Sequence, residues 1–236
     1  MTTSNLNCCE LPTRHDTADV PAEATANCCT PQRQSTSEAL RQIQSTTATT
    51  DLARVRAAGF RLLLDTGKPV GLAELADAAD LDLATVERLV KQAKGRVQVD
   101  DAGRLLGVAG LTVSPTQHEI TIGDQKRWTW CALDAVGILG ALNATGTIRS
   151  TDPQTGRRVH IEVVNGQPED DATLFILGGY EGGNVTEDWC PLVNFFTTHS
   201  DAQEWVTANN VTGDIVSVSE IAADATSMWR PVTDPA

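Results

Sequence analysis

The spacing of apolar residues predicts helices in the first half of the chain. Residues 37–65 carry apolar positions three and four apart, which predicts one or two amphipathic helices that end at Gly67. Shorter helical patterns follow over residues 72–76 and 83–90, and the alternation over residues 97–108 predicts a β-hairpin. Helices in this order followed by a hairpin are typical of a winged helix-turn-helix module.

Beyond Thr112 the pattern changes to short strands and turns. A hairpin is expected around Gly123–Asp124, and a mostly apolar helix follows within residues 128–146. The remaining segments predict strands within 145–150, 157–166, 172–179 and 190–198, a helix over 201–210, and a strand that runs into a final helix over 213–229. The predicted fold is α+β: an N-terminal winged helix-turn-helix module, then a mixed, mainly antiparallel sheet core with flanking helices.

Three regions follow from these changes in pattern. Residues 1–36 are rich in Thr, Ser, Asn, Pro and Ala and are expected to form a flexible tail that carries two pairs of cysteines. Residues 37–113 form the predicted winged-helix-like domain, and residues 114–236 form the predicted catalytic α+β domain.

The charge distribution excludes several classes of protein. Residues 114–236 hold six basic and seventeen acidic residues, a net charge of −11, within a chain of net charge −13. Such a surface repels phosphates, so binding to DNA is not expected. No apolar run reaches the ~20 residues of a membrane-spanning helix, and the first residues lack the pattern of a secretory signal. We therefore expect a cytoplasmic protein that does not bind membranes.

The six cysteines of this 236-residue chain suggest chemistry rather than disulfides, because thiols stay reduced in the cytosol. Cys131 and Asp134 are three residues apart at the start of the apolar helix, so both side chains are expected on one face. The helix dipole there is expected to favour the thiolate of Cys131. With Cys190, two sulfur ligands and one carboxylate would suit a thiophilic metal and a proton transfer.

The same residues also allow a purely structural interpretation. A cysteine on an apolar helix is often a small core residue, and Asp134 could be a buried acid satisfied by backbone donors. The spacing of Cys131 and Asp134 is by itself a weak signal.

Two segments resemble one known family. Residues 127–134, Arg-Trp-Thr-Trp-Cys-Ala-Leu-Asp, resemble the Trp-Cys-Ala-Leu-Asp segment of the alkylmercury lyases, which cleave organomercurials in bacterial mercury resistance. Residues 190–196, Cys-Pro-Leu-Val-Asn-Phe-Phe, resemble the second active-site segment of that family. The order of the predicted modules is similar too, and the resemblance covers roughly residues 37–225.

The resemblance implies a reaction and roles for three residues. Cys131 would attack the mercury of R–Hg⁺, Cys190 would be the second sulfur ligand, and Asp134 would pass a thiol proton to the carbon leaving group. The products would be R–H and Hg²⁺, so mercury is substrate and product, and no organic cofactor is expected. External low-molecular-weight thiols would release the product, and a mercuric reductase is a possible acceptor. The resemblance also implies that the winged-helix module is structural.

The chain departs from the family pattern at two positions. Asp152 stands where the family often has a third, structural cysteine, and Pro191 follows Cys190 where some relatives have another cysteine. Since Phe is sparse, the expected substrate pocket depends on Trp128, Trp130 and Trp189, although buried tryptophans more often belong to the core than to a pocket wall.

Other functions remain open at this stage. Cys8, Cys9, Cys28 and Cys29 could capture mercury, or could belong to an expendable extension. A thiol-based metal-sensing transcriptional regulator would use the winged helix to bind DNA. A mercury chaperone would need the thiols but not Asp134.

Overall fold

The structure is a computed structural model that describes residues 50–93, 95–178 and 183–234. This part of the chain begins with three helices and a hairpin. The first helix ends where Gly67 adopts a φ of 62°, and Asp82 caps the third by accepting a hydrogen bond from the Thr85 backbone N–H at 2.9 Å. This order confirms the hairpin and the helices predicted within residues 50–90, whereas residues 37–49 of the first predicted helical segment lie outside the described residues. The elements are α2 (Thr50–Thr66), α3 (Leu72–Ala79), α4 (Leu83–Gln92), β1 (Val97–Val99) and β2 (Leu105–Val108).

The hairpin continues into a large antiparallel sheet. Its strand order is β1-β2-β3-β5-β4-β6-β7-β8, and each neighbouring pair is antiparallel. Strand β3 joins the two predicted domains, because it pairs with both β2 and β5. The boundary predicted between residues 113 and 114 thus stays a prediction. The further strands are β3 (Leu111–Thr112), β4 (His118–Ile122), β5 (Gln125–Thr129), β6 (Gly146–Thr151), β7 (Arg158–Val164) and β8 (Gln167–Pro168).

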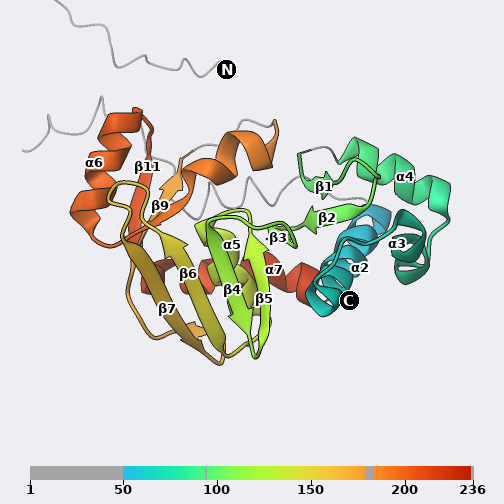
Figure 1. Ribbon diagram of the computed structural model, residues 1–236, viewed down its shortest axis with the longest axis horizontal. Helices are drawn as coiled ribbons and strands as arrows, with labels where there is room; N and C mark the ends of the chain where they lie inside the picture. The colour runs from blue at the N-terminus through green and yellow to red at the C-terminus, as the bar shows by residue number, and fades with distance from the viewer. Residues whose placement is uncertain (1–49, 94, 179–182, 235–236) are drawn as a thin grey trace, which may run out of the picture. The chain divides into compact units, whose positions relative to one another are not determined.

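A smaller antiparallel sheet and three helices complete the fold (Figure 1). The small sheet has the order β10-β9-β11. Helix α5 lies against β4, β5 and β6 of the large sheet and packs on α7, so the α+β class with flanking helices is confirmed. The remaining elements are α5 (Ala132–Ala141), β9 (Thr173–Leu177), β10 (Asn194–Phe196), α6 (His199–Asn209), β11 (Gly213–Ser217) and α7 (Val218–Thr233).

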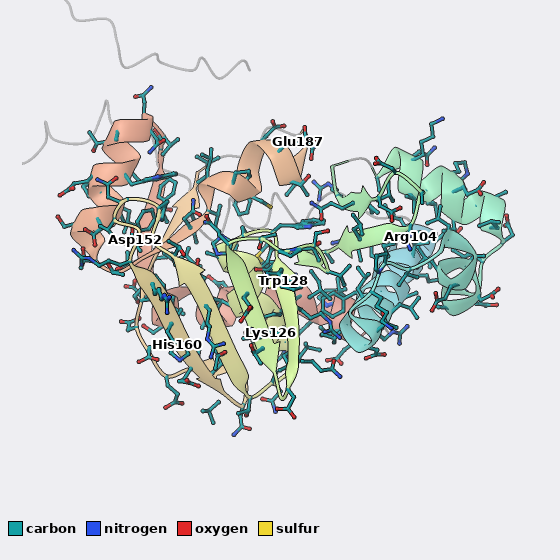
Figure 2. All side chains as sticks on the ribbon, viewed as in Figure 1. Arg104, Lys126, Trp128, Asp152, His160 and Glu187 are labelled. Atoms are coloured by element: carbon teal, nitrogen blue, oxygen red, sulfur yellow. The ribbon has the colours of Figure 1, made fainter. Side chains whose placement is uncertain are left out.

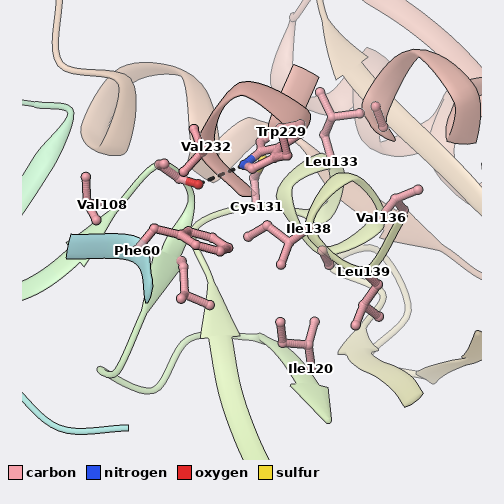
Figure 3. Packing of buried hydrophobic residues seen from close by; sticks show 14 of the residues in the cluster. Phe60, Val108, Ile120, Cys131, Leu133, Val136, Ile138, Leu139, Trp229 and Val232 are labelled. Atoms are coloured by element: carbon pink, nitrogen blue, oxygen red, sulfur yellow. Dashed lines mark hydrogen bonds between the residues drawn. The ribbon is translucent and has the colours of Figure 1, made fainter. Parts of the chain in front are cut away.

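The main core surrounds α5, whose residues 132–139 are all buried. One continuous apolar cluster includes Phe60 of α2, Ile120 of β4, Ile138 of α5 and Trp229 of α7 (Figure 3). Helix α7 can approach closely because Gly137 has no side chain, and a Cβ there would collide with the Trp229 indole. This packing holds the amino-terminal end of α5 in place.

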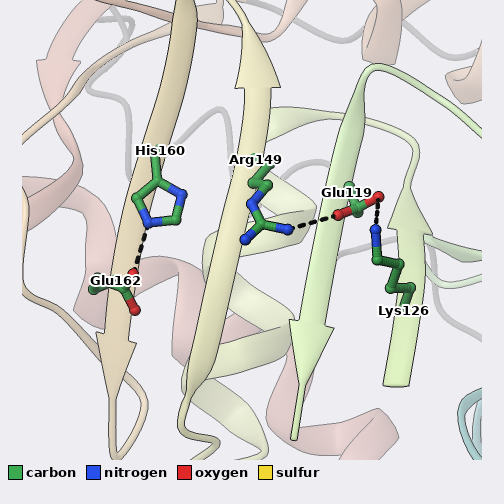
Figure 4. A network of polar contacts seen from close by, with 5 residues as sticks. All are labelled: Glu119, Lys126, Arg149, His160 and Glu162. Atoms are coloured by element: carbon green, nitrogen blue, oxygen red, sulfur yellow. Dashed lines mark hydrogen bonds and ion pairs between the residues drawn. The ribbon is translucent and has the colours of Figure 1, made fainter. Parts of the chain in front are cut away.

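The outer face of the large sheet is polar. Glu119 pairs with Lys126 at 3.1 Å and with Arg149 at 3.4 Å, and His160 pairs with Glu162 at 2.6 Å (Figure 4). Such exposed pairs contribute little to stability. None of the candidate catalytic residues lies in this network. We therefore look for the active site on the other face of the sheet, which α5 covers.

Among the described residues, no helix is long and apolar enough to cross a membrane.

Candidate active site

Cys131 and Asp134 together cap the start of α5. The Cys131 backbone N–H donates to Asp134 Oδ2 at 2.9 Å, and the Cys131 sulfur accepts from the Asp134 backbone N–H. This reciprocal pattern is a capping box, in which residues three apart satisfy two N–H groups that the helix leaves unpaired. The spacing seen in the sequence therefore has a local structural cause, and it places thiol and carboxylate side by side.

Cys190 reaches the same point from a distant part of the chain. A π-helical turn over Val185–Trp189 leads into a 3₁₀ turn over Cys190–Leu192. The Ala132 backbone N–H at the start of α5 donates to the Val193 carbonyl at 3.1 Å, which joins the two segments. One ligand atom each from Cys131, Asp134 and Cys190 lies within 4.8 Å of the others.

All three groups are buried, and both sulfurs are reduced. Cys131 is fully buried, whereas Cys190 is 2% exposed and Asp134 is 6% exposed. Both cysteines are free thiols. Two sulfurs and one carboxylate form a donor set that favours a soft, thiophilic metal. The structure thus brings together the three residues that the sequence analysis singled out.

Burial controls the protonation of the site. Burial raises the pKa of Cys131 well above its ordinary value, and its hydrogen bond with Cys190 and the charge of Asp134 raise it further. For Cys190, the hydrogen bond with Cys131 lowers the pKa, but burial and the Asp134 charge raise it by more. The prediction that the helix dipole favours the thiolate of Cys131 is therefore wrong. Desolvation of the thiolate outweighs the dipole, so the pKa of Cys131 is raised and not lowered.

Asp134 is suited to hold a proton near neutral pH. Burial raises its pKa to about 7, although hydrogen bonds with Cys131 act in the opposite direction. A carboxyl group with this pKa can both accept and release a proton at physiological pH.

A turn between β2 and β3 packs directly on Asp134. Ala109 and Gly110 both have positive φ, at 52° and 83°. A Cβ on Gly110 would collide with Oδ1 of Asp134, so only glycine lets the turn approach the carboxyl group. The Trp229 indole N–H fixes the turn by donating to the Ala109 carbonyl at 2.8 Å (Figure 3).

A cavity of about 310 Å³ opens onto Asp134 and Cys190. Trp130 and Trp189, two of the three tryptophans predicted to line a substrate pocket, line this cavity; that it binds substrate stays a prediction. Trp128 is not among its lining residues; it lies half-buried on β5, two residues before Trp130 (Figure 2). The other lining residues are Arg56, Arg96, Ala109, Gly110, Leu133, Val185, Ser227, Met228, Trp229, Pro231 and Val232.

Several of these residues had no signal in the sequence. Trp229 is one apolar residue of a helix, and Gly110 is one glycine in a turn, so neither is distinguished until the chain folds. Arg56 lies on a helix whose sequence pattern is ordinary and amphipathic. Cys8, Cys9, Cys28 and Cys29 lie outside the described residues.

The comparisons with known proteins agree with one another. The model of the alkylmercury lyase family matches residues 111–229. An alkylmercury lyase of Staphylococcus epidermidis is 30% identical over 149 residues, which cover 61% of this chain and 68% of that protein. One from Streptomyces lividans is 28% identical over 176 residues, which cover 73% and 79%.

A solved structure supports the fold. The crystal structure of the mercury-bound form of MerB2 superposes with a TM-score of 0.75 at 18% identity, and the match covers 83% of this chain and 97% of that one.

Proposed function

This chain belongs to the alkylmercury lyase family, and from that premise we propose that it cleaves the carbon–mercury bond of organomercurials by protonolysis. The overall reaction is R–Hg⁺ + H⁺ → R–H + Hg²⁺. The observation that carries the proposal is the meeting of two free thiols and a carboxyl group within 4.8 Å, beside a cavity.

The first steps bind the metal. Cys131 forms a sulfur–mercury bond and displaces the thiol that carried the mercurial, which leaves with the Cys131 proton. Cys190 then binds through its sulfur, and its proton passes to the Asp134 carboxylate. Metal binding reverses the effect of burial on the thiol pKa values, because a coordinating thiol is deprotonated outright.

Proton delivery to carbon completes the reaction. The second thiolate increases electron density on mercury and weakens its bond to carbon. Asp134 gives its proton to that carbon, R–H leaves, and Hg²⁺ stays bound to the two sulfurs while Asp134 returns to the carboxylate. Carbon is a poor proton acceptor, so the fixed position of Asp134 must supply much of the rate.

The product needs an acceptor. We expect low-molecular-weight thiols to remove Hg²⁺, and a mercuric reductase to be a possible recipient. A capture role for Cys8, Cys9, Cys28 and Cys29 also stays a prediction. Unchanged mercury resistance in cells after all four are replaced by Ser would contradict it.

Asp134 distinguishes this proposal from a mercury chaperone. A chaperone has no use for a buried acid whose pKa is about 7, whereas protonolysis requires one. The amino-terminal helices and hairpin are proposed to be a structural module of winged-helix type, because they share the main core with α5.

Headspace measurement of benzene from phenylmercury with excess thiol tests the function. We expect the wild-type protein to release benzene, and Cys131→Ala, Cys190→Ala and Asp134→Ala to lose at least ~100-fold in rate, the size of a general-acid contribution. Asp124→Ala, at an exposed turn, is the matched control and should keep full activity. Tight Hg²⁺ binding by the wild type without benzene release would instead indicate a chaperone or a sensor.

A further inference from the structure

A buried asparagine holds the turn that carries Cys190. Asn194, the first residue of β10, is 1% exposed. Its side-chain N–H donates to the Pro191 carbonyl at 2.9 Å, inside the 3₁₀ turn over Cys190–Leu192. The Val193 backbone N–H closes this turn by donating to the Cys190 carbonyl at 3.1 Å. Since a single 3₁₀ turn has poor hydrogen-bond geometry of its own, contacts from outside it help to determine where the Cys190 sulfur lies.

Residues of the large sheet hold this asparagine in place. Gln117, just before β4, donates from its side-chain nitrogen to Asn194 Oδ1. The same nitrogen lies 3.1 Å from Nε2 of His118, the first residue of β4. Nδ1 of His118 lies 2.9 Å from the hydroxyl oxygen of Ser150 on β6. These four side chains, the polar row, connect β6 and β4 to the turn that carries Cys190.

The Pro191 carbonyl determines the direction of every hydrogen bond in the polar row. A carbonyl can only accept, so the Asn194 amide presents its NH₂ group to Pro191 and its oxygen to Gln117. Gln117 must then donate, which leaves His118 Nε2 as an acceptor and places the ring proton on Nδ1, facing Ser150. Burial lowers the pKa of His118 to about 3, so the ring stays neutral and the pattern persists at physiological pH.

We propose that Asn194 is a positioning residue, which holds the sulfur of Cys190 where it can bind mercury already attached to Cys131. Gln117 and His118 act through Asn194. Cys131 is placed by a different device, the capping box of α5, so the polar row orients the second sulfur and not the first. This inference rests on the proposed function, in which proton delivery to carbon follows the binding of the second sulfur.

Asn194→Ala should stall the reaction after the first sulfur–mercury bond. All variants are made in a parent chain in which the four cysteines of residues 1–36 are replaced by Ser, so Cys131 and Cys190 remain. One equivalent of phenylmercury is added without other thiol, and native mass spectrometry follows its conversion to the Hg²⁺ adduct. We expect Asn194→Ala to bind phenylmercury as fully as the parent but to convert it about tenfold more slowly, the size of one hydrogen bond.

This split between binding and conversion separates positioning from a general loss of structure, which lowers both together. Conversion by Asn194→Ala at the parent's rate would contradict the positioning role.

The exposed member of the polar row provides a second variant. Gln117 is exposed, so Gln117→Ala is expected to fold even if Asn194→Ala does not. We expect it to slow the conversion about threefold, because Asn194 keeps its bond to the turn but loses its support. The double variant should be no slower than Asn194→Ala alone, since both changes act through one contact. Conversion by Gln117→Ala at the parent's rate, or single effects that multiply in the double variant, would contradict the polar row.

Asp152→Ala is the control matched for stability. Asp152 is also buried, and it accepts from the Thr197 backbone N–H at 2.9 Å, just beyond the end of β10 that lies away from the Cys190 turn. Its loss should loosen the same strand, yet we expect conversion per folded molecule at the parent's rate. Equal slowing in Asp152→Ala and Asn194→Ala would contradict a specific role of Asn194.

Failure of the lyase reaction gives a different result. A parent chain that binds phenylmercury but releases no benzene contradicts the proposed function, whereas the position of Cys190 can still be measured with Hg²⁺ alone. Dithiothreitol then competes for the metal held by the two sulfurs. The concentration that removes half of the Hg²⁺ should fall about tenfold in Asn194→Ala and stay unchanged in Asp152→Ala. An unchanged concentration in Asn194→Ala would contradict the positioning role.

Discussion

At the scale of single residues, the capping box explains why Cys131 and Asp134 are three apart. The helix start requires a side-chain acceptor at each position, and the same geometry places the proton carrier beside the thiol. The sequence could predict this pair because both residues belong to one helical turn. It could not predict the contact with Cys190 from spacing, since 59 residues separate the two cysteines; only the family resemblance indicated it.

Replacement of Asp134 by Asn should change the pH dependence of stability. The folded-state pKa is raised from 3.8 to about 7, so the folded protein loses stability as the pH rises through this window. The asparagine amide keeps an oxygen acceptor for the Cys131 N–H but cannot ionise. We expect Asp134→Asn to gain stability relative to the wild type at pH 8, on the order of 4 kcal/mol, with little difference at pH 4.

Urea unfolding at the two pH values measures this effect. A wild-type protein whose unfolding free energy does not fall, relative to the variant, between pH 4 and pH 8 would show that the carboxyl group is not desolvated as described.

Gly110 should affect catalysis as well as stability, because it combines a positive φ with a close approach to Asp134. Gly110→Ala introduces a strained positive φ and a collision with Asp134, so we expect a loss of about 1–3 kcal/mol in stability. Hydrocarbon release should fall as well, because the carboxyl group must move. Gly103→Ala is the control: its φ is 74°, but a Cβ there meets nothing within 4 Å, so it should lose stability without loss of turnover per folded molecule. Equal turnover in the two variants would contradict the positioning role.

At the scale of elements, the prediction from sequence succeeds where the hydrophobic pattern is local. The 3.6-residue and two-residue periods place α3, α4, β4, β5 and β7 correctly. The segment around Cys190 was expected to lead directly into a strand, but a π-helical and a 3₁₀ turn come first, and only Asn194–Phe196 is a strand. Irregular turns that depend on tertiary contacts, here the bond from Ala132 to Val193, leave no periodic signal.

Asp152 joins two elements by hydrogen bonds. It is fully buried at the end of β6 (Figure 2) and accepts from the Thr197 backbone N–H at 2.9 Å, just after β10. The Gln154 and Thr155 backbone N–H groups donate to its other oxygen. Burial raises the pKa of Asp152, but these bonds lower it by more, so the net pKa lies below the ordinary value.

Asp152→Ala should therefore destabilise the fold by about 1–3 kcal/mol, the cost of buried donors left without partners. Because the folded-state pKa is lowered, this stabilisation is present at neutral pH and is lost as the pH falls through that pKa. The difference from the wild type in chemical unfolding should thus shrink at acid pH. Asp101→Ala, at an exposed position, is the control, and an equally small effect of both variants would contradict the role of Asp152.

At the scale of the whole molecule, one core connects the amino-terminal helices to the catalytic helix. The apolar cluster extends from α2 through α5 to α7, and the cavity is built from the same elements. The sequence predicted most of the helices and strands but not the cavity that they form together, because a cavity built from distant segments leaves no pattern in the spacing of residues. Arg56 and Trp229 are the clearest examples.

The charge of the molecule makes a prediction about DNA. With a net charge of −13, the protein should give no specific complex with its own promoter in a gel-shift assay, even at low salt. A DNA-binding surface needs an excess of basic residues, whereas this sequence has 18 basic and 31 acidic residues. A specific, salt-sensitive shift released by mercury would favour the regulator over the lyase.

The most direct test of the account separates metal binding from proton delivery in one sample. Wild-type protein and Asp134→Asn are each mixed with one equivalent of phenylmercury, without added thiol, and bound mercury and headspace benzene are measured together. The account predicts that both proteins retain the mercury through Cys131 and Cys190, and that only the wild type releases close to one equivalent of benzene. Release of benzene by Asp134→Asn at the wild-type rate would contradict Asp134 as the proton donor.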